Sequence, residues 1–250
     1  MNGNLYTHIQ NNVGIIKFGH PAGNSFPKAL LESLTNELDK LSDNDAVSVI
    51  ILKSEGDRTF CAGASFDELM AIETPEQGIA FFSGFANVIN AMRSSTKMMI
   101  GCVQGKAVGG GVGLIAACDY VFATKDAAIK LSEFTIGIGP FVIAPAVERK
   151  IGIAGLSELT VAGHEWKSAY WAKEKGLYAA VFETQKEMES EAEALSMKLA
   201  SYNPASLEEM KKVFWKGTDN WNSLLKERAA ISGSLVLSDF TKKALQKFKK

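Results

Sequence analysis

The sequence is poor in the residues that most often build metal sites and disulfide frameworks. Its 250 residues include three cysteines and three histidines. Cys61, Cys102 and Cys118 stand far apart and form no C-x-x-C pair, so we expect neither a metal site nor a disulfide scaffold. Although Cys61 lies in a glycine-containing loop, no histidine is placed by sequence to activate it. We therefore interpret it as a small buried apolar residue rather than a nucleophile.

Neither sign of charge predominates. Lysine and arginine total 27 and aspartate and glutamate 28, a net charge of −1. Binding to phosphate backbones requires a basic surface, so no nucleic-acid partner is expected. The first residues lack the basic and apolar regions of a secretory signal. Residues 98–118 are long enough to span a membrane, but they include Lys106 and several glycines. We expect no membrane association and a soluble, cytoplasmic protein.

The apolar residues form two kinds of pattern along the chain. In the first half, buried apolar runs predict strands at residues 13–18, 47–53, 98–103 and 120–124, and amphipathic segments predict helices at residues 28–41 and 75–92. This alternation favours an α/β fold with largely parallel strands. The second half holds a short apolar run at residues 178–182 and predicted helices at residues 185–202, 205–215, 219–231 and 238–248. We therefore expect an α/β core followed by a helical C-terminal region.

Two loops of small residues stand where a predicted strand ends and a helix begins. They are residues 60–65, FCAGAS, and residues 109–114, GGGVGL. The first N–H groups of a helix have no partner within the helix, and small side chains let a ligand approach the backbone. One such loop can bind an anion. Two that converge can place two N–H groups on a single oxygen, which is an oxyanion hole.

Glu133 is a lone carboxylate in the segment KLSEFTIG, residues 130–137. The residues leave two readings open. It is either a helix cap or solvated loop acid, or an enclosed group whose raised pKa suits it to general acid–base catalysis. Residues 111–116 also match the dinucleotide-binding pattern G-x-G-x-x-A with Glu133 downstream. Too few residues follow before the next strand for a crossover helix, which argues against that site. Asp67 and Glu68 are interpreted as solvated carboxylates.

Taken together, the motifs resemble those of the crotonase superfamily, the enoyl-CoA hydratase/isomerase family. The resemblance covers nearly the whole chain and includes similarity to bacterial methylglutaconyl-CoA hydratase-like members. The motifs that carry it are PAGNSF at residues 21–26, the two loops, ACD at residues 117–119, LSE at residues 131–133, IGIGP at residues 136–140 and AKEKGL at residues 172–177.

The resemblance implies a fold, a substrate and an assembly. It predicts a ββα-superhelix core at residues 1–195 and a C-terminal helical trimerisation region at residues 196–250. The substrate would be an acyl-CoA, with no cofactor beyond this CoA thioester, and the protein would be a homotrimer or hexamer. The apolar residues of the C-terminal region that are compatible with subunit contacts are Leu224, Leu225, Ile231, Leu235, Val236 and Leu237.

The family's functional residues map onto this sequence position by position. The backbone N–H groups of Ala64 and Gly110 would hold the thioester oxygen as it becomes an enolate, and Glu133 matches the family's second catalytic glutamate. Residues expected to bind substrate or CoA are Ser25, Phe26, Ala62, Ala64, Gly109 and Gly113. Lysines of the tail are further candidates for the CoA phosphates: Lys242, Lys243, Lys247, Lys249 and Lys250.

Two departures from the family pattern leave the reaction open. Gly113 stands where the family's first catalytic glutamate would fall, and Ser65 replaces the usual aspartate. In hydration, two glutamates position and activate a water molecule, whereas moving a double bond needs only one base. The expected function is hydration or double-bond shift of an enoyl-CoA. The alternatives are a crotonase-type decarboxylase or thioester hydrolase, and a non-catalytic acyl-CoA-binding protein.

Overall fold

The strands are divided between two sheets in the computed structural model, which describes residues 3–247. The larger sheet has the order β1-β2-β3-β5-β7-β9, with β1 antiparallel to β2 and every other pair parallel. Its strands are Asn4–Gln10, Val13–Gly19, Val49–Ser54, Met98–Val103, Tyr120–Thr124 and Ala180–Phe182. The smaller sheet is parallel, with the order β4-β6-β8, and its strands are Thr59–Cys61, Lys106–Val108 and Ile129–Lys130.

Successive strand pairs build this architecture. Each of the pairs β3–β4, β5–β6 and β7–β8 contributes one strand to each sheet, and helical structure follows. The helices that follow are α2 and α3 (Phe66–Met70 and Pro75–Ser94), α4 (Gly110–Ala117), and the 3-10 helix η1 with α5 (Glu133–Ile136 and Ala144–Val161). This repetition is the ββα superhelix that the family resemblance predicts, so the expected fold class is confirmed.

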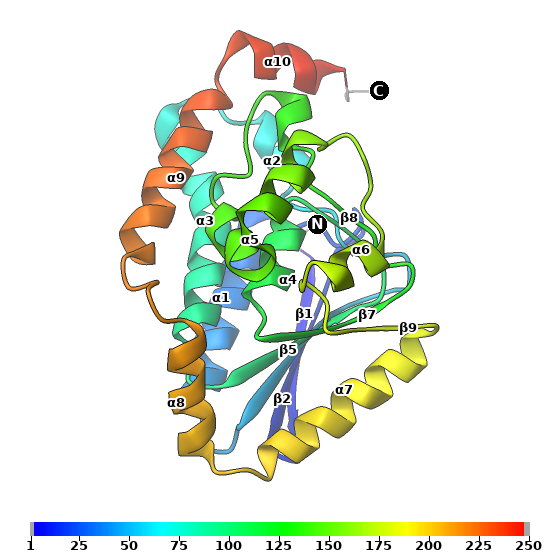
Figure 1. Cartoon of the computed structure of the whole chain (residues 1–250). Coiled ribbons are helices and arrows are strands. Elements are labelled where there is room, and N and C mark those ends of the chain that lie inside the picture. Colours follow the sequence, from blue (N-terminus) through cyan, green and yellow to red (C-terminus); the bar gives the residue numbers. More distant parts are fainter. Residues whose placement is uncertain (1–2, 248–250) are drawn as a thin grey trace.

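Helices cover both faces of the larger sheet (Figure 1). On one face, the leucines of α1 (Lys28–Ser42) and the apolar sides of α3 and α4 form the main core with alternate residues of β2 and β3. On the other face, α7 (Gln185–Ala200) packs through Met188 and Ala192. Strand β5 is buried along its whole length, as expected for a central parallel strand. The short helix α6 (Ala169–Glu174) precedes β9.

The C-terminal helices fold back over the core. They are α8 (Pro204–Phe214), α9 (Trp221–Leu235) and α10 (Asp239–Gln246). In Figure 1, α9 runs beside α3, and the two helices meet where Gly78 and Gly233 touch: a Cβ built on Gly78 would lie 2.7 Å from Gly233 Cα. Helix α10 lies over the loop at Gly137, where an added Cβ would lie 2.6 Å from Thr241 Oγ1. The C-terminal helices therefore cover structure of their own chain.

Several sequence expectations can be placed on this fold. The stretch 98–118 is divided among β5, β6 and α4, and no helix within residues 3–247 is both long and apolar enough to cross a membrane. The expected boundary after residue 195 falls inside α7. Of the C-terminal residues named above, Phe248, Lys249 and Lys250 lie outside the described residues.

Candidate active site

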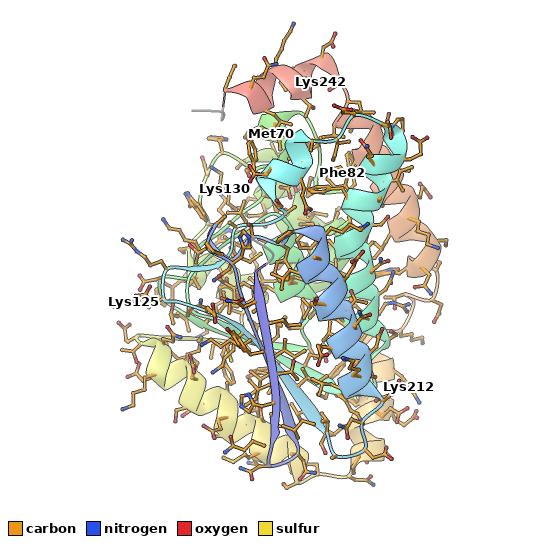
Figure 2. The ribbon with its side chains drawn as sticks, turned by 180° about the vertical axis from the view of Figure 1, so that it is seen from behind. Met70, Phe82, Lys125, Lys130, Lys212 and Lys242 are labelled. Carbon is orange, nitrogen blue, oxygen red and sulfur yellow. The ribbon has the colours of Figure 1, made fainter. Side chains whose placement is uncertain are left out.

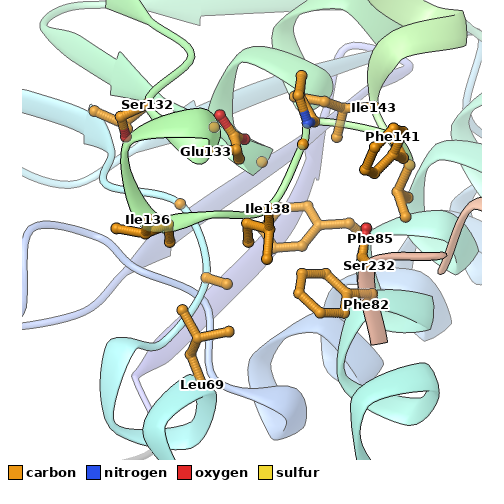
Figure 3. A pocket seen from close by; sticks show the side chains of 18 of the residues that line it. Leu69, Phe82, Phe85, Ser132, Glu133, Ile136, Ile138, Phe141, Ile143 and Ser232 are labelled. Carbon is orange, nitrogen blue, oxygen red and sulfur yellow. The ribbon is translucent and has the colours of Figure 1, made fainter. Parts of the chain in front are cut away.

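A cavity of about 440 Å³ lies where the two small-residue loops meet η1 and α3 (Figure 3). Ala62, Ala64, Gly109, Gly110 and Glu133 all line it. These residues come from three separate segments of the chain, so the fold brings together the groups in which the sequence indicated chemistry.

The first loop is held so that one N–H group remains free. Ala64 forms an isolated parallel bridge with Phe26, whose N–H donates to the Gly63 carbonyl at 2.8 Å. The Ser65 N–H donates back to the Phe26 carbonyl at 2.9 Å. Since backbone polar groups alternate in direction along an extended chain, the Ala64 N–H points away from Phe26. It donates to no acceptor that the described residues provide.

The second loop presents a similar donor at the start of α4. Gly109 has φ of 53°, a conformation that favours glycine, and its N–H donates to the Lys130 carbonyl at 3.0 Å. Gly110 is the first residue of the helix, so its N–H has no intrahelical partner. The loops are adjacent, because a Cβ built on Gly63 would lie 3.8 Å from the Gly110 nitrogen. Two unpaired donors therefore face one cavity, the arrangement that an oxyanion requires.

Glu133 begins η1 and brings its carboxyl group over the second loop. A Cβ on Gly109 would lie 2.8 Å from Glu133 Oε1, so a side chain at residue 109 would displace the carboxyl group. Oε2 is buried and has no hydrogen-bond partner among the described residues. Burial raises the pKa of Glu133 from 4.5 to about 7. Of the two readings of this residue, the geometry fits the enclosed acid.

Gly113 does not reach the cavity, although the sequence suggested that it contacts substrate. It is buried in α4, and the space that a side chain would need is filled: a Cβ on Gly113 would lie 2.7 Å from Ile143 Cβ. Ile143 itself lines the cavity. The position at which the family pattern has a carboxylate is therefore covered by an aliphatic side chain.

Ser25 and Phe26 also lie outside the cavity lining. Phe26 is fully buried, with ring centroids 4.7 Å from Phe18 and 6.0 Å from Phe85. The Ser25 hydroxyl is buried and lies 3.2 Å from His20 Nδ1. A motif match assigns positions along the chain, but it does not reveal that Phe26 points into the core and that Ser25 faces His20.

The remaining expected groups have structural roles. Ser65 caps α2, accepting a hydrogen bond from the Glu68 N–H at 3.4 Å, a role that serine and aspartate share. The Glu68 carboxylate accepts from the Lys28 N–H at 2.9 Å. Cys61 is buried beneath α4, and burial raises the pKa of its thiol to about 12. Within residues 3–247 no group of three or more His, Cys, Asp or Glu is arranged to hold a metal.

Much of the cavity wall was not identified from the sequence. Its apolar part comes from α2, α3 and the segment after η1, and includes Leu69, Phe81, Phe82, Phe85, Ile138 and Phe141. Ser232 of α9 completes this side. The phenylalanines of α3 follow a helical spacing that is equally typical of core residues, so the sequence offered no signal that distinguishes a pocket wall from a core.

Two lysines and a tryptophan form a basic patch beside the cavity. Lys106 Nζ lies 5.0 Å and Lys130 Nζ 5.7 Å from the ring centroid of Trp166, and both Lys130 and Trp166 line the cavity. Among the described residues, neither lysine has a carboxylate within 4.0 Å. Figure 2 shows Lys130 at the level of α2, above Lys125, which instead pairs with Glu183 at 2.7 Å. The patch has two positive charges without a protein counterion.

Known proteins resemble this chain along nearly its whole length. The family model described as enoyl-CoA hydratase/isomerase matches residues 8–250. A probable enoyl-CoA hydratase of Bacillus subtilis is 28% identical over 238 residues, covering 94% of this chain and 92% of the relative. The mitochondrial methylglutaconyl-CoA hydratase of Rattus norvegicus is 33% identical over 165 residues, covering 66% of this chain and 52% of the relative.

A solved structure confirms the fold independently. The crystal structure of enoyl-CoA hydratase from Bacillus halodurans superimposes with a TM-score of 0.90 at 20% identity, covering 97% of this chain and 99% of that one. The family match spans both loops, η1 and the C-terminal helices. From its sequence motifs, its fold and this match, the chain belongs to the enoyl-CoA hydratase/isomerase family.

Proposed function

We propose that the protein is an acyl-CoA enzyme that stabilises a thioester enolate, with Glu133 as its general acid and base. The observation that carries this proposal is the enclosure of Glu133 in one cavity with two unpaired backbone donors, Ala64 N–H and Gly110 N–H. A carboxyl group with a pKa of about 7 can both take and return a proton near neutral pH.

The proposed reaction needs only these groups. The thioester oxygen of an enoyl-CoA lies between the two N–H groups, which withdraw electron density from the carbonyl. Glu133 takes a proton from C2 or C4 of the acyl chain, and the resulting negative charge is delocalised onto the thioester oxygen. The protonated Glu133 then returns the proton to the other end of the three-carbon system. Loss of one oxyanion donor typically lowers the rate by about 10²–10³-fold.

A double-bond shift is favoured over hydration by the packing at Gly113. Hydration with two carboxylates requires a second acid to hold the water, but Ile143 covers that position. Among the described residues, Glu133 is the only carboxylate in the cavity lining. One base moving one proton between two carbons is sufficient for isomerisation.

The CoA portion is proposed to leave the cavity along Ala62 and Gly109 toward the basic patch of Lys106, Lys130 and Trp166. The two lysines lack protein counterions, and the phosphates of CoA would supply them. The tail lysines Lys242, Lys243 and Lys247 remain further candidates for binding the CoA phosphates. They would bind CoA either in their own subunit or in a neighbouring one.

The proposal includes assembly into a homotrimer or hexamer. It also includes a role in this assembly for the C-terminal helical region, residues 196–250. Leu225 and Val236 are buried within their own chain, so they are poor support for subunit contacts. Exposed apolar side chains on α5 and α6 are better support, namely Ile153, Val161 and Tyr170. Light scattering of the purified protein measures the number of subunits.

The test of the activity is turnover of a panel of enoyl-CoA thioesters by the wild type and by Glu133→Gln. We expect products of unchanged mass for isomerisation, and mass spectrometry separates these from a gain of water or a loss of carbon dioxide. Glu133→Gln should remove most turnover and retain acyl-CoA binding, whereas the exposed control Asp67→Asn retains both. Full activity of Glu133→Gln would exclude the proposal. Tight binding without turnover of any thioester would favour a non-catalytic binding protein.

A further inference from the structure

The far side of the cavity, defined here as Leu69, Phe82, Phe85, Ile138 and Ser232, is formed by segments that lie far apart in the sequence. Leu69, Phe85 and Ile138 are at least 93% buried. In Figure 3, Phe82 and Ser232 lie across the cavity from Ser132, with Glu133 and Ile138 between. An acyl group whose thioester oxygen is held at Ala64 and Gly110 would extend toward this far side.

No charged side chain belongs to the far side. The described cavity lining contains two charged groups, Glu133 and Lys130. Lys130 lies beside Trp166, in the basic patch, and Glu133 is the proposed base. A carboxylate at the far side would lose its water without gaining a cation, and it would share a cavity with Glu133, which has the same charge when ionised.

Ser232 provides the one polar side chain of the far side. The residue is 1% exposed and lines the cavity. A serine hydroxyl can donate or accept a hydrogen bond, so a polar atom of the acyl group can pair with it there. Because the hydroxyl is neutral, it can satisfy an uncharged oxygen but cannot offset a full negative charge.

From these observations we propose that the far side selects acyl groups that are uncharged and largely apolar, and that it rejects acyl groups with a carboxylate at their far end. This inference rests on the proposed function, because it requires the acyl group rather than the CoA to occupy the space beyond Glu133. It adds a substrate class to that function.

The experiment compares two saturated acyl-CoA thioesters of equal medium chain length, one ending in a methyl group and one in a carboxylate. Their dissociation constants for the wild-type protein are measured by calorimetry. We expect the carboxylate to bind roughly 100-fold more weakly, as an unpaired buried charge requires. Equal affinities overturn the inference. Saturated compounds need no turnover, so this result is obtained even if every assay of the proposed activity fails.

A positive charge introduced at the far side tests whether these residues contact the end of the acyl chain. Ser232→Lys would supply the missing cation and should reduce the discrimination at least about tenfold. Ser232→Ala, the matched neutral control, should retain it. If circular dichroism shows that Ser232→Lys is unfolded, Phe82→Lys takes its place, because Phe82 is partly exposed. Unchanged discrimination in a folded lysine variant would overturn the assignment of this wall to the acyl end.

Discussion

Gly113 of α4 faces Ile143 so closely that the two positions cannot both carry a side chain. A Cβ on Gly113 would lie 2.7 Å from Ile143 Cβ, far inside the ordinary contact distance. Hence glycine at residue 113, where the family pattern has a carboxylate, leaves the space that the Ile143 side chain fills in the cavity wall.

This coupling predicts the behaviour of a restored acid. Gly113→Glu alone should lower the free energy of unfolding by about 1–3 kcal/mol, the usual cost of overpacking. Gly113→Glu combined with Ile143→Gly should recover part of that loss, because the second change removes the clashing Cβ and makes room for the carboxylate. Denaturant unfolding measures both, and mass spectrometry then detects whether the double variant gains water addition. If Gly113→Glu alone were as stable as the wild type, the packing described here would be wrong.

Glu133 should make stability depend on pH. Its folded pKa of about 7 lies above the unfolded value near 4.5, so the folded state retains a proton that the unfolded state has lost. Stability therefore falls as pH rises from about 4.5 to 7 and is level outside that window. Glu133→Gln removes the penalty, and its advantage should grow to about 2 kcal/mol above pH 7, allowing for the partial exposure of Glu133. Unfolding of both proteins across this range, with Asp67→Asn as control, measures the difference. A constant difference would contradict the raised pKa.

The same pKa sets the pH dependence of turnover. Only the ionised carboxylate can take a proton from the substrate, so kcat/KM should rise with pH and level off above a midpoint near 7. A steady-state pH series measures it, with an enoyl thioester of N-acetylcysteamine as substrate, because this thioester lacks the ionising phosphates of CoA. A midpoint near the ordinary carboxyl value would mean that Glu133 is solvated in the free enzyme.

The second proposed oxyanion donor depends on the absence of a side chain at Gly110. A Cβ there would lie 2.8 Å from Phe85 Cε2, so Gly110→Ala must shift either the ring or the start of α4. We expect kcat to fall by about 10²–10³-fold, the cost of losing one donor. Adding Phe85→Leu should restore part of kcat, which a simple loss of folding would not allow. An unchanged kcat in Gly110→Ala would exclude this donor.

The basic patch predicts a difference between complete and truncated thioesters. Lys106→Ala and Lys130→Ala should each raise KM for a CoA thioester about fivefold, as expected for an exposed charge contact, and leave kcat unchanged. The N-acetylcysteamine thioester lacks the phosphates, so its KM should not change. Lys125→Ala is the matched control, since Lys125 is paired with Glu183. Equal effects on both thioesters would assign the lysines a structural role.

Local pattern was sufficient for the central strands, and it drew attention to the segments that line the cavity. The predicted residues 98–103 and 120–124 coincide with β5 and β7, because β-branched and other apolar runs in a parallel sheet are buried on both faces. Glu133 and the two loops were identified because a lone acid and clustered small residues are unusual in their surroundings. These signals extend over a few neighbouring positions, whereas the proposed roles came from the family resemblance.

What the sequence did not predict depends on contacts between distant segments. Phe26 and Phe82 are both phenylalanines near functional motifs, yet one lies between two rings of the core and the other lines the cavity. Ser232 reaches the cavity only because α9 folds back along α3. The strands of the smaller sheet are too short for a periodic pattern, so β4, β6 and β8 were not predicted as strands.

Helices α3 and α9 approach closely at Gly78 and Gly233, because neither residue has a side chain to hold their backbones apart. Phe82 lies one helical turn beyond Gly78, and Ser232 directly precedes Gly233, so both walls of the acyl end are positioned by that crossing. A single methyl group at either glycine would part the helices and deepen the pocket while every lining side chain stayed the same. The proposed choice of acyl group can therefore be altered by substitution at a position outside the cavity lining.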